Sequence, residues 1–363
     1  MGAERVKLGI VGLGRWAKVL ARAAATSDAL RICAAYSRSQ DKREGFAREF
    51  GIPCVASLEA MLADPALQGV ILTVPNEQHL PLAVAVAKAG KHVYTEKPIA
   101  STLEEGLEMA DLQRTYGVTV TVGHSARLMA GIRAIRVAIE RGELGRVAFM
   151  EANFSNERAL ELNPQTWRWY RDRAPGGPLS QLAVHHFDVL RYLGGDVVET
   201  SSIASKLSPV GAEVDDQSMT LLRFADGKVG YVGSCWTSPG IFAVRVFGSK
   251  GLMHYEIDFR TWDTPEKLHE SATLYIQRGK DGYAKRQTLT IPESDMFRAE
   301  LDLFAESCRT AKENELSADN ANAAVAILYA ALRSVEEHGR LVGIAEVMES
   351  ARARVAERRR NAA

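Results

Sequence analysis

The chain has 363 residues, of which 46% are hydrophobic and 25% charged, and its 45 basic residues balance 45 acidic ones. This length predicts two domains of ordinary globular composition. A formal net charge of zero offers no general attraction for nucleic acid or an anionic membrane, so we expect neither as a partner. The balance also excludes a disordered acidic chain and a collagen-like fibre.

No segment resembles a membrane anchor, a signal peptide or a disulfide framework. No run approaches the roughly 18–20 uninterrupted apolar residues of a membrane-spanning helix, and the first residues lead directly into an apolar strand pattern. The cysteines Cys33, Cys54, Cys235 and Cys308 are scattered and form no CxxC pair, which predicts free thiols and no metal site. We therefore expect a cytoplasmic protein. The arginine-rich residues 352–360 are interpreted as a solvated helix end, in preference to an RNA-binding tail.

Strands and helices alternate in the first third of the chain. Short apolar runs predict strands at residues 6–11, 30–36, 70–74, 92–96 and 118–122. They lack in-and-out alternation, as strands buried on both faces do. Helical patterns lie between them at residues 16–25, 42–50 and 80–89, and Gly51 and Gly90 stand where helices should stop. The alternation predicts an α/β fold with a doubly wound parallel sheet of the Rossmann kind.

The turn after the first strand has the sequence Gly12-Leu13-Gly14-Arg15-Trp16-Ala17, a G-x-G-x-x-A pattern. Gly12 permits the tight turn, Gly14 leaves room for a diphosphate against the backbone, and Ala17 lets the helix pack closely on the strand. The following helix would offer its free N–H groups to the phosphates. Because the pattern follows a strand and opens a helix, it predicts a dinucleotide site rather than an empty glycine turn.

The end of the second strand indicates which dinucleotide binds. An NAD-specific site usually has an acidic residue about 20 residues beyond the glycines, and this chain has Ser37-Arg38-Ser39 there. A hydroxyl and a guanidinium suit a ribose 2′-phosphate, although an ordinary polar loop would have the same composition. We therefore predict NADP as the cofactor, in preference to NAD.

Further motifs follow in a fixed order along the chain. They are Thr73-Val74-Pro75-Asn76-Glu77-Gln78-His79, then Glu96-Lys97-Pro98, then Gly176-Gly177-Pro178-Leu179 leading to His185. Gly142-Glu143-Leu144-Gly145, Trp167-Arg168 and residues 333–339 add to the pattern. Together with the glycine turn, these segments resemble the glucose–fructose oxidoreductase/inositol dehydrogenase/MocA family (Gfo/Idh/MocA). The resemblance covers nearly the whole chain.

The resemblance implies an N-terminal Rossmann domain, residues 1–124, and a C-terminal α/β domain, residues 125–363, with a large, open, mostly antiparallel sheet. The second half of the sequence agrees with this. Residues 218–224 and 229–236 alternate around Ala225-Asp226-Gly227-Lys228, a hairpin signal. Residues 242–247, 251–256 and 272–278 continue the strand-rich pattern. In the family this sheet often forms an oligomer interface, so we expect a homodimer or homotetramer.

Lys97 is the leading catalytic candidate. Hydride transfer between a carbinol carbon and nicotinamide needs a group that takes or supplies the hydroxyl proton. In the family the lysine of the E-K-P motif lies beside nicotinamide and substrate, at the carboxyl end of a strand. That is also where open α/β sheets bind ligands. Pro98 would fix the turn, and related proteins often have a cis bond there.

His185 is the second catalytic candidate. Residues 181–193 predict a helix, on which Gln181, His185 and Asp188 share one face while His186 points elsewhere. The family's D-x-G-x-H pattern aligns with residues 181–185, so an aspartate is replaced by Gln181. An amide cannot take up a proton at neutral pH. We expect Lys97 to transfer the proton, His185 to hydrogen-bond the reacting oxygen and Gln181 to orient substrate.

The complete set of predicted site residues divides by role. The cofactor-binding candidates are Gly12, Gly14, Arg15, Trp16, Ser37, Arg38, Thr73, Pro75, Asn76, His79, Glu96 and Lys97. The substrate-binding candidates are Lys97, Arg127, Trp167, Arg168, Gln181 and His185. Aromatic faces suit sugar C–H surfaces and arginine binds hydroxyls or carboxylates, although a loop or core role explains Arg127, Trp167 and Arg168 equally well.

These residues predict an NAD(P)-dependent oxidoreductase acting on a sugar, a polyol or a related cyclic alcohol. A cis-dihydrodiol of an aromatic ring is an alternative substrate within the same family. A protein that binds NADP(H) as a sensor or scaffold, without turnover, is a second alternative. The presence of both Lys97 and His185 disfavours the sensor, because binding alone needs neither side chain.

Overall fold

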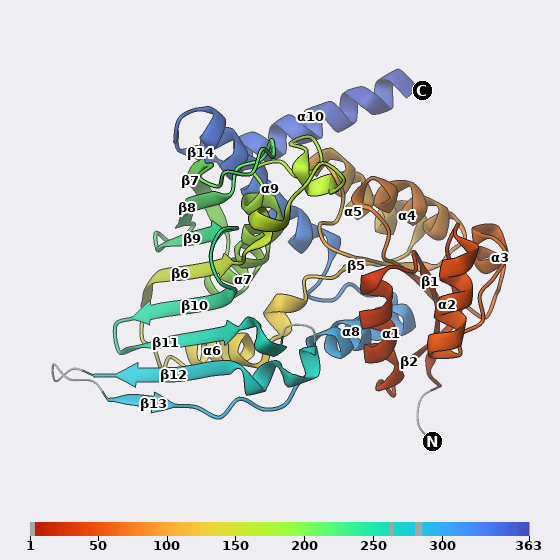
Figure 1. The fold of residues 1–363 in the computed structure, drawn as a ribbon, viewed down its shortest axis with the longest axis horizontal. Coiled ribbons are helices and arrows are strands. Elements are labelled where there is room, and N and C mark those ends of the chain that lie inside the picture. The colour runs from red at the N-terminus through yellow and green to blue at the C-terminus, as the bar shows by residue number, and fades with distance from the viewer. Residues whose placement is uncertain (1–3, 262–263, 280–284, 363) are drawn as a thin grey trace. The chain divides into compact units, whose positions relative to one another are not determined.

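The chain forms two compact units in the computed structural model, which describes residues 4–261, 264–279 and 285–362 (Figure 1). The first unit contains residues 4–125, Asp295–Asn322 and 351–362, and the second contains the described part of Ala126–Ser294 together with Ala323–Ser350. The sequence predicts a continuous second domain over residues 125–363. Two segments of that range, Asp295–Asn322 and residues 351–362, belong instead to the first unit, because their helices pack there.

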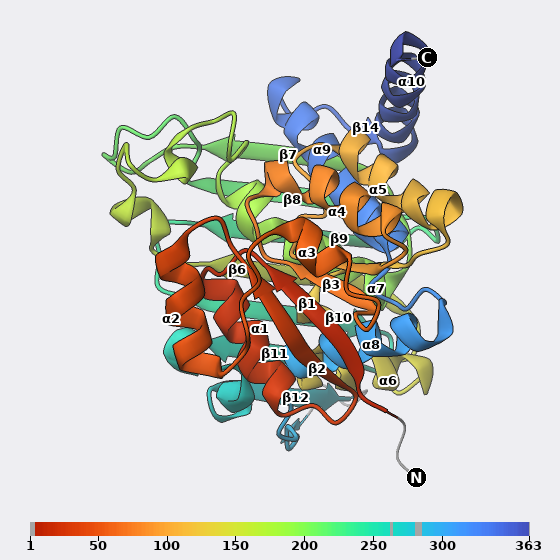
Figure 2. The same cartoon turned by 90° about the vertical axis from the view of Figure 1, so that its right-hand side faces the viewer.

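The first unit is built on a five-stranded parallel sheet in the order β2-β1-β3-β4-β5. Its strands are β1 (Val6–Val11), β2 (Leu30–Tyr36), β3 (Gly69–Leu72), β4 (His92–Thr95) and β5 (Val120–Val122). Figure 2 shows β1 and β2 side by side in the red, N-terminal part of the ribbon. The predicted doubly wound parallel sheet is confirmed. The chain leaves β1 toward β2 on one side and reaches β3 on the other, which makes β1 and β3 the point where the strand order reverses.

Helices connect and cover these strands. They are α1 (Arg15–Ala25), α2 (Gln40–Phe50), α3 (Leu58–Leu62), α4 (His79–Lys88) and α5 (Leu103–Tyr116). Their ends follow local rules. Thr102 and Glu105 form a capping box at the start of α5, and Gly51 and Gly117 adopt the left-handed conformation that ends α2 and α5.

A helix from late in the chain completes the core of the first unit. This helix, α8 (Met296–Thr310), packs on the parallel sheet. A Cβ at Gly69 would lie 2.8 Å from the Phe304 ring and 3.0 Å from the Cys308 sulfur, so β3 approaches α8 through glycine. The Phe304 and Tyr94 rings are 5.8 Å apart. Burial of such aromatic surface is the main stabilising term in this layer.

The second unit is built on a nine-stranded, mostly antiparallel sheet in the order β13-β12-β11-β10-β6-β9-β8-β7-β14. Its strands are β6 (Val147–Ser155), β7 (Val197–Ser205), β8 (Gln217–Phe224), β9 (Val229–Cys235), β10 (Ile241–Gly248), β11 (Gly251–Asp258), β12 (Ala272–Arg278), β13 (Arg286–Thr288) and β14 (Val342–Gly343). Only β6 and β9 run parallel; the other neighbours are antiparallel. The predicted open antiparallel sheet and its β8–β9 hairpin are confirmed.

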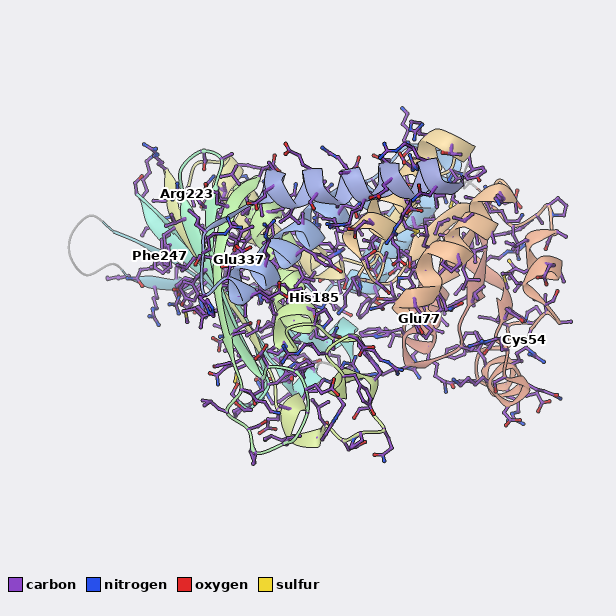
Figure 3. The ribbon with its side chains drawn as sticks, turned by 90° about the horizontal axis from the view of Figure 1, so that it is seen from above. Cys54, Glu77, His185, Arg223, Phe247 and Glu337 are labelled. Carbon is purple, nitrogen blue, oxygen red and sulfur yellow. The ribbon has the colours of Figure 1, made fainter. Side chains whose placement is uncertain are left out.

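Helices cover one face of this sheet, and the strands alternate accordingly. Contacts join α6 (Ala130–Glu140) to β11 and α7 (Val184–Gly194) to β6, while a hydrogen bond joins α9 (Ala318–Glu336) to β7. On β10 the side chains of Phe242, Val244 and Val246 are buried beneath the helices. Figure 3 shows His185 on the helical side of the sheet and Phe247 on the opposite side. The outer face exposes large apolar side chains, among them Ile203, Met219 and Leu221.

The arginine-rich end of the chain lies in helix α10 (Ile344–Ala362). Within the first unit, three of its arginines pair with acidic residues of α5. The pairs are Arg354 with Glu104, Arg358 with Glu108 and Arg359 with Asp111. The interpretation as a solvated helix end is thus incomplete, since these arginines are half exposed but paired. Among the described helices, none is long and apolar enough to cross a membrane.

Candidate functional site

The glycine turn after β1 is shaped by close contacts with the loop after β3. Gly12 has a φ of +92°, and a Cβ there would lie 2.7 Å from both the Thr73 carbonyl oxygen and the Val74 side chain. A larger residue at position 12 would therefore clash and be strained. The Thr73 hydroxyl donates a hydrogen bond to the Gly12 carbonyl. Thr73 thus holds the turn in place.

The start of α1 fits an anionic group. Gly14 is its N-cap residue, no side chain caps the helix, and its first turn has no acidic residue. A Cβ at Gly14 would meet nothing within 4 Å, so the backbone is open on that side. Ala17 is fully buried, as close packing of helix on strand requires. Uncapped N–H groups beside open space suit the diphosphate of a dinucleotide, and Arg15 and Trp16 lie in the same turn.

The end of β2 carries a basic cluster. Arg38 is exposed, and Ser37 is partly buried beside it. Arg43, from the first turn of α2, donates to the carbonyl oxygens of Ser37 at 2.5 Å and Arg38 at 3.3 Å. Ser39 caps α2 through the Lys42 N–H. Arg43 was not among the sequence candidates; its position four residues after the cap Ser39 is the signal that would have found it.

The loop after β3 is anchored by a buried histidine. Pro75 is exposed and Asn76 starts a short 3₁₀ turn, Asn76–Gln78. His79 is fully buried, with Nδ1 at 3.0 Å from the Pro98 carbonyl oxygen and Nε2 at 3.1 Å from that of Val74. Burial lowers its pKa. The structure thus places His79 between the loops after β3 and β4, where it positions both and has no open side toward a ligand.

Lys97 lies immediately after β4 and is partly buried. The Lys97–Pro98 peptide bond is cis. The carboxyl ends of β1, β2, β3 and β4 share one edge of the sheet, so the structure brings together Gly12, Ser37, Thr73 and Lys97 at that edge. This is the edge where open parallel sheets bind dinucleotides.

A buried acidic cluster lies next to Lys97 in the fold and includes Glu96, a predicted cofactor-binding residue, together with Tyr94 and Glu300, which the sequence did not single out. Glu96 is 8% exposed, while Tyr94 and Glu300 are fully buried. The Tyr94 hydroxyl donates a 2.7 Å hydrogen bond to Glu300. Burial raises the pKa of Glu96 to about 7, against the opposing effect of Lys97, and burial also raises the pKa of Glu300 well above its usual value. Glu300 comes from α8, so sequence spacing could not connect it to β4.

In the second unit, the predicted helix from Gln181 begins differently. Residues Leu179–Ala183 form a π-helical turn, and the regular helix α7 starts only at Val184. A π turn changes the angular spacing, so Gln181 does not keep the regular α-helical phase with His185. Gln181 and His185 are both partly buried. π turns are frequent at functional sites, which suits this position.

The two adjacent histidines have different surroundings. His186 is fully buried, stacks on Phe242 at 4.3 Å between ring centroids, and has its pKa lowered to about 3 by burial. It is a core residue. His185 is partly buried and lies 5.5 Å from the Phe154 ring. Of the two, His185 is the one with a side chain accessible to a ligand.

Arg127 and Asp188 form a buried ion pair. Arg127 Nε donates to Asp188 at 2.8 Å, and Nη2 makes a second hydrogen bond to the other carboxylate oxygen. The two side chains are 4% and 1% exposed. The guanidinium also lies 5.4 Å from the Tyr192 ring centroid. The structure therefore places Arg127 where it holds α7, and hence the helix that carries His185, rather than where it would face solvent.

Trp167 and Arg168 are the remaining substrate candidates, and they share one short turn. Trp167 and Arg168 belong to a 3₁₀ turn, Trp167–Trp169, in which the Arg168 guanidinium lies 4.2 Å above the Trp167 ring. Both side chains are partly exposed and present a flat surface of the kind that packs against sugars. In the part of the chain that the structure describes, no group of histidine, cysteine and acidic residues has the arrangement of a metal site.

Both halves of the chain match known family models. The model described as an oxidoreductase family with an NAD-binding Rossmann fold matches residues 6–124. The model described as the GFO/IDH/MocA C-terminal domain matches residues 132–254.

Individual relatives extend this similarity. A 1,5-anhydro-D-fructose reductase of Ensifer adhaerens is 32% identical over 250 residues, which cover 68% of this chain and 74% of the relative. A myo-inositol 2-dehydrogenase of Thermotoga maritima is 23% identical over 352 residues, covering 94% and 100%. A crystal structure from Desulfitobacterium hafniense, assigned provisionally as an NADPH-dependent oxidoreductase, is 36% identical with a TM-score of 0.92, covering 96% and 100%.

Proposed function

The chain belongs to the GFO/IDH/MocA oxidoreductase family, and we propose that it transfers a hydride between NADP(H) and a carbinol or carbonyl carbon of a sugar, polyol or related cyclic alcohol. The observation that carries this proposal is the position of Lys97. It follows a central strand at the sheet edge that also bears the open glycine turn. A base at this edge is placed to serve an alcohol whose hydride goes to the dinucleotide.

Each protein group has a defined task in this proposal. The nicotinamide, when bound, supplies or accepts the hydride. In the oxidising direction Lys97 accepts the hydroxyl proton on its neutral amine, and in the reducing direction its ammonium returns that proton. His185 hydrogen-bonds the reacting oxygen, and Gln181 orients the substrate through its amide. Gln181 cannot replace a carboxylate in a proton relay, so proton transfer rests on Lys97.

We propose NADP rather than NAD on the basis of charge at the end of β2. Arg38 is exposed there, and Arg43 holds the carbonyls of Ser37 and Arg38. No acidic side chain follows β2 at the position that would bind a ribose 2′-hydroxyl. The 36%-identical structure assigned as NADPH-dependent supports the same choice.

Substitution of Lys97 tests the function. The purified protein is incubated with NADP or NAD and a panel of sugars, inositols and cis-dihydrodiols, and absorbance of the reduced nicotinamide is followed. Lys97→Ala should lower kcat by about 10²–10⁴-fold, as expected for loss of a general base. Lys88→Ala, an exposed lysine at the end of α4, is the matched control. Near wild-type turnover by Lys97→Ala would refute the assignment, and binding of dinucleotide without turnover of any compound would favour a sensor.

Substitution of Arg38 tests the cofactor. Arg38→Leu should weaken NADP binding roughly tenfold and leave NAD binding nearly unchanged, because only NADP has the phosphate. Arg48→Leu removes an exposed arginine from the other end of α2 and serves as the control. Tighter binding of NAD than NADP by the unaltered protein would contradict the proposal.

We further propose that copies of this chain assemble through the outer face of the nine-stranded sheet. Ile203, Met219 and Leu221 on β7 and β8 are 72%, 55% and 55% exposed on that face. Neighbouring exposed apolar residues of this kind mark association surfaces. The molar mass measured by light scattering should be that of a homodimer or homotetramer. The double variant Met219→Glu, Leu221→Glu should have a lower molar mass, because charged side chains on this face oppose association.

A further inference from the structure

The acidic cluster behind Lys97 has no task in the reaction outlined above. Its three members, Tyr94, Glu96 and Glu300, all belong to the first unit. Tyr94 donates to one oxygen of Glu300 at 2.7 Å. A Cβ at Gly123 would lie 2.6 Å from the Tyr94 hydroxyl and 3.4 Å from Glu96 Oε2, so these two oxygens border the same glycine.

The hydrogen bonding of the cluster is incomplete. Glu96 Oε1 and Glu300 Oε2 are buried and have no hydrogen-bond partner among the described residues. An ionised carboxylate deprived of water and of donors is strongly disfavoured, and two of them close together are more so. The cluster therefore retains at least one proton. Burial, and after it the charge of Glu96, raises the pKa of Glu300 and so favours its protonated form.

Glu96 is the member that exchanges its proton most readily. It is adjacent to Lys97 in the chain, its carboxylate is stabilised both by the Lys97 charge and by a hydrogen bond from the Lys97 backbone N–H, and burial opposes both effects. The balance leaves the pKa of Glu96 at about 7.

We propose that Glu96 is the proton-exchange partner of Lys97, and that Tyr94 and Glu300 form the buried, neutral wall that keeps Glu96 free of competing donors. The proposal rests on the proposed function of Lys97 and deepens it. Glu96 acts through Lys97, so it is a positioning residue for the charge of that amine.

Oxidation of the alcohol releases one hydride and one proton. During alcohol oxidation the C–H hydride leaves with its electron pair, and the O–H proton passes to the Lys97 amine, which becomes an ammonium. The ammonium then gives one proton to the Glu96 carboxylate, which becomes a carboxylic acid and later releases the proton to solvent. Lys97 is thereby reset as a neutral amine. In the reducing direction the same steps run backwards, and Glu96 reloads Lys97.

Charged groups act on both acids of the cluster. Lys97 acts on Glu96, and Asp295, which caps α8, acts on Glu300. Burial and the neighbouring glutamates raise the pKa of Tyr94 well above its usual value, so it stays a neutral donor. Over the neutral pH range Glu96 is therefore the cluster member whose charge changes.

The test is the pH dependence of turnover in carboxyl-to-amide variants. Wild-type kcat for oxidation should rise with pH as Glu96 ionises and can receive the proton, with a midpoint at or above about 7, because a neutral Lys97 no longer lowers the pKa of Glu96. Glu96→Gln should lose this rise and lower kcat roughly 10–100-fold, with little change in KM. Glu104→Gln, which removes another buried glutamate of the first unit, is the control and should keep the wild-type profile.

Two further measurements keep the outcome decisive. Glu96→Asp retains a carboxyl, so it should keep the rise in kcat with a displaced midpoint, and an undisplaced profile would overturn the proposal. Infrared spectra of the cofactor-free protein should show two protonated-carboxyl contributions: one from Glu300 that persists, and one from Glu96 that is lost as pH rises through about 7. Only the pH-sensitive contribution should be absent from Glu96→Gln, and its persistence in that variant would also overturn the proposal. If Lys97→Ala were active, the proposed function would be refuted. If Lys97→Ala were inactive but Glu96→Gln had the same pH dependence of kcat as wild type, only the role of Glu96 would be refuted.

Discussion

The two units bury ionisable side chains in opposite ways. In the second unit Arg127 and Asp188 form a closed pair, with two hydrogen bonds between a guanidinium and a carboxylate that are both almost fully buried. In the first unit Glu96 and Glu300 are equally buried, but each has a carboxylate oxygen without a partner among the described residues. In a closed pair each buried charge faces an opposite one, whereas a buried acid with an unpartnered oxygen has its charged form disfavoured.

The difference relates to what each neighbouring candidate residue needs. The proposed role of His185 needs a fixed position, and the closed pair holds the helix that carries it. The proposed role of Lys97 needs a changeable charge, and Glu96, its neighbour in the chain, is the acid proposed to supply it. Neither burial nor an incomplete set of hydrogen bonds identifies a catalytic group by itself, since His186 has both features and packs in the core.

Breaking the closed pair should have the largest effect on stability. Arg127→Met leaves the Asp188 carboxylate buried without its partner, which should lower the free energy of unfolding by about 3–5 kcal/mol. Chemical denaturation at neutral pH measures this. Arg223→Met is a control in the same unit, because Arg223 is 55% exposed and pairs with Glu199 away from α7. A loss in Arg127→Met no larger than in this control would show that the pair is not what holds α7.

Removing the Glu96 carboxyl should raise the free energy of unfolding, by less than Arg127→Met lowers it. The pKa of Glu96 is raised from 4.5 to about 7 on folding, so the folded protein binds a proton that the unfolded chain has lost over this range. Wild-type stability should therefore fall as pH rises from 4.5 to 7. Glu96→Gln removes this penalty and should stabilise the protein by about 3 kcal/mol at pH 8, since the pKa rise is about 2.5 units at roughly 1.4 kcal/mol per unit.

Denaturation at pH 4.5 and pH 8 checks that prediction. The gain should be present at pH 8 and nearly absent at pH 4.5. A variant that is destabilised equally at both values would mean that Glu96 is a closed structural group like Asp188, and the contrast between the two units would disappear.

The half-exposed pairs of α10 should have the smallest effect. Arg354 is 53% exposed while its partner Glu104 is 8% exposed. Arg354→Met should cost about 1 kcal/mol or less, because solvent screens the charge of the arginine. Denaturation in low and high salt should show the cost shrinking with salt, whereas the cost of Arg127→Met should not. An equal salt response in the two variants would contradict the distinction between buried and exposed pairs.

Local patterns predicted the parallel sheet and the glycine turn well. The bounds of β1 and β2 match the predicted runs to the residue, because strands buried on both faces appear as continuous apolar stretches. The β8–β9 hairpin followed from alternation around a turn. Residues such as Gly12 were identifiable because the chemistry of a tight turn depends on one residue type.

Tertiary contacts were beyond the reach of such patterns. Glu300 lies 206 residues from Tyr94 in the chain, and no spacing rule joins them. The π turn at Leu179–Ala183 interrupts a sequence with ordinary helical periodicity. Arg127 was predicted as a substrate ligand by residue type, but the buried partner that occupies its guanidinium, Asp188, could be assigned only from coordinates.

The late position of α8 in the chain affects how the first unit folds during synthesis and where a fragment of it can be cut. The first 125 residues leave the ribosome long before residues 295–322, so the parallel sheet must wait for the side chains of Leu301 and Phe304 to cover it. A fragment cut at the apparent end of the dinucleotide domain would expose that apolar face and lack Glu300, one of the three members of the acidic cluster. A chimaera that transplants this dinucleotide domain therefore has to carry α8 with it.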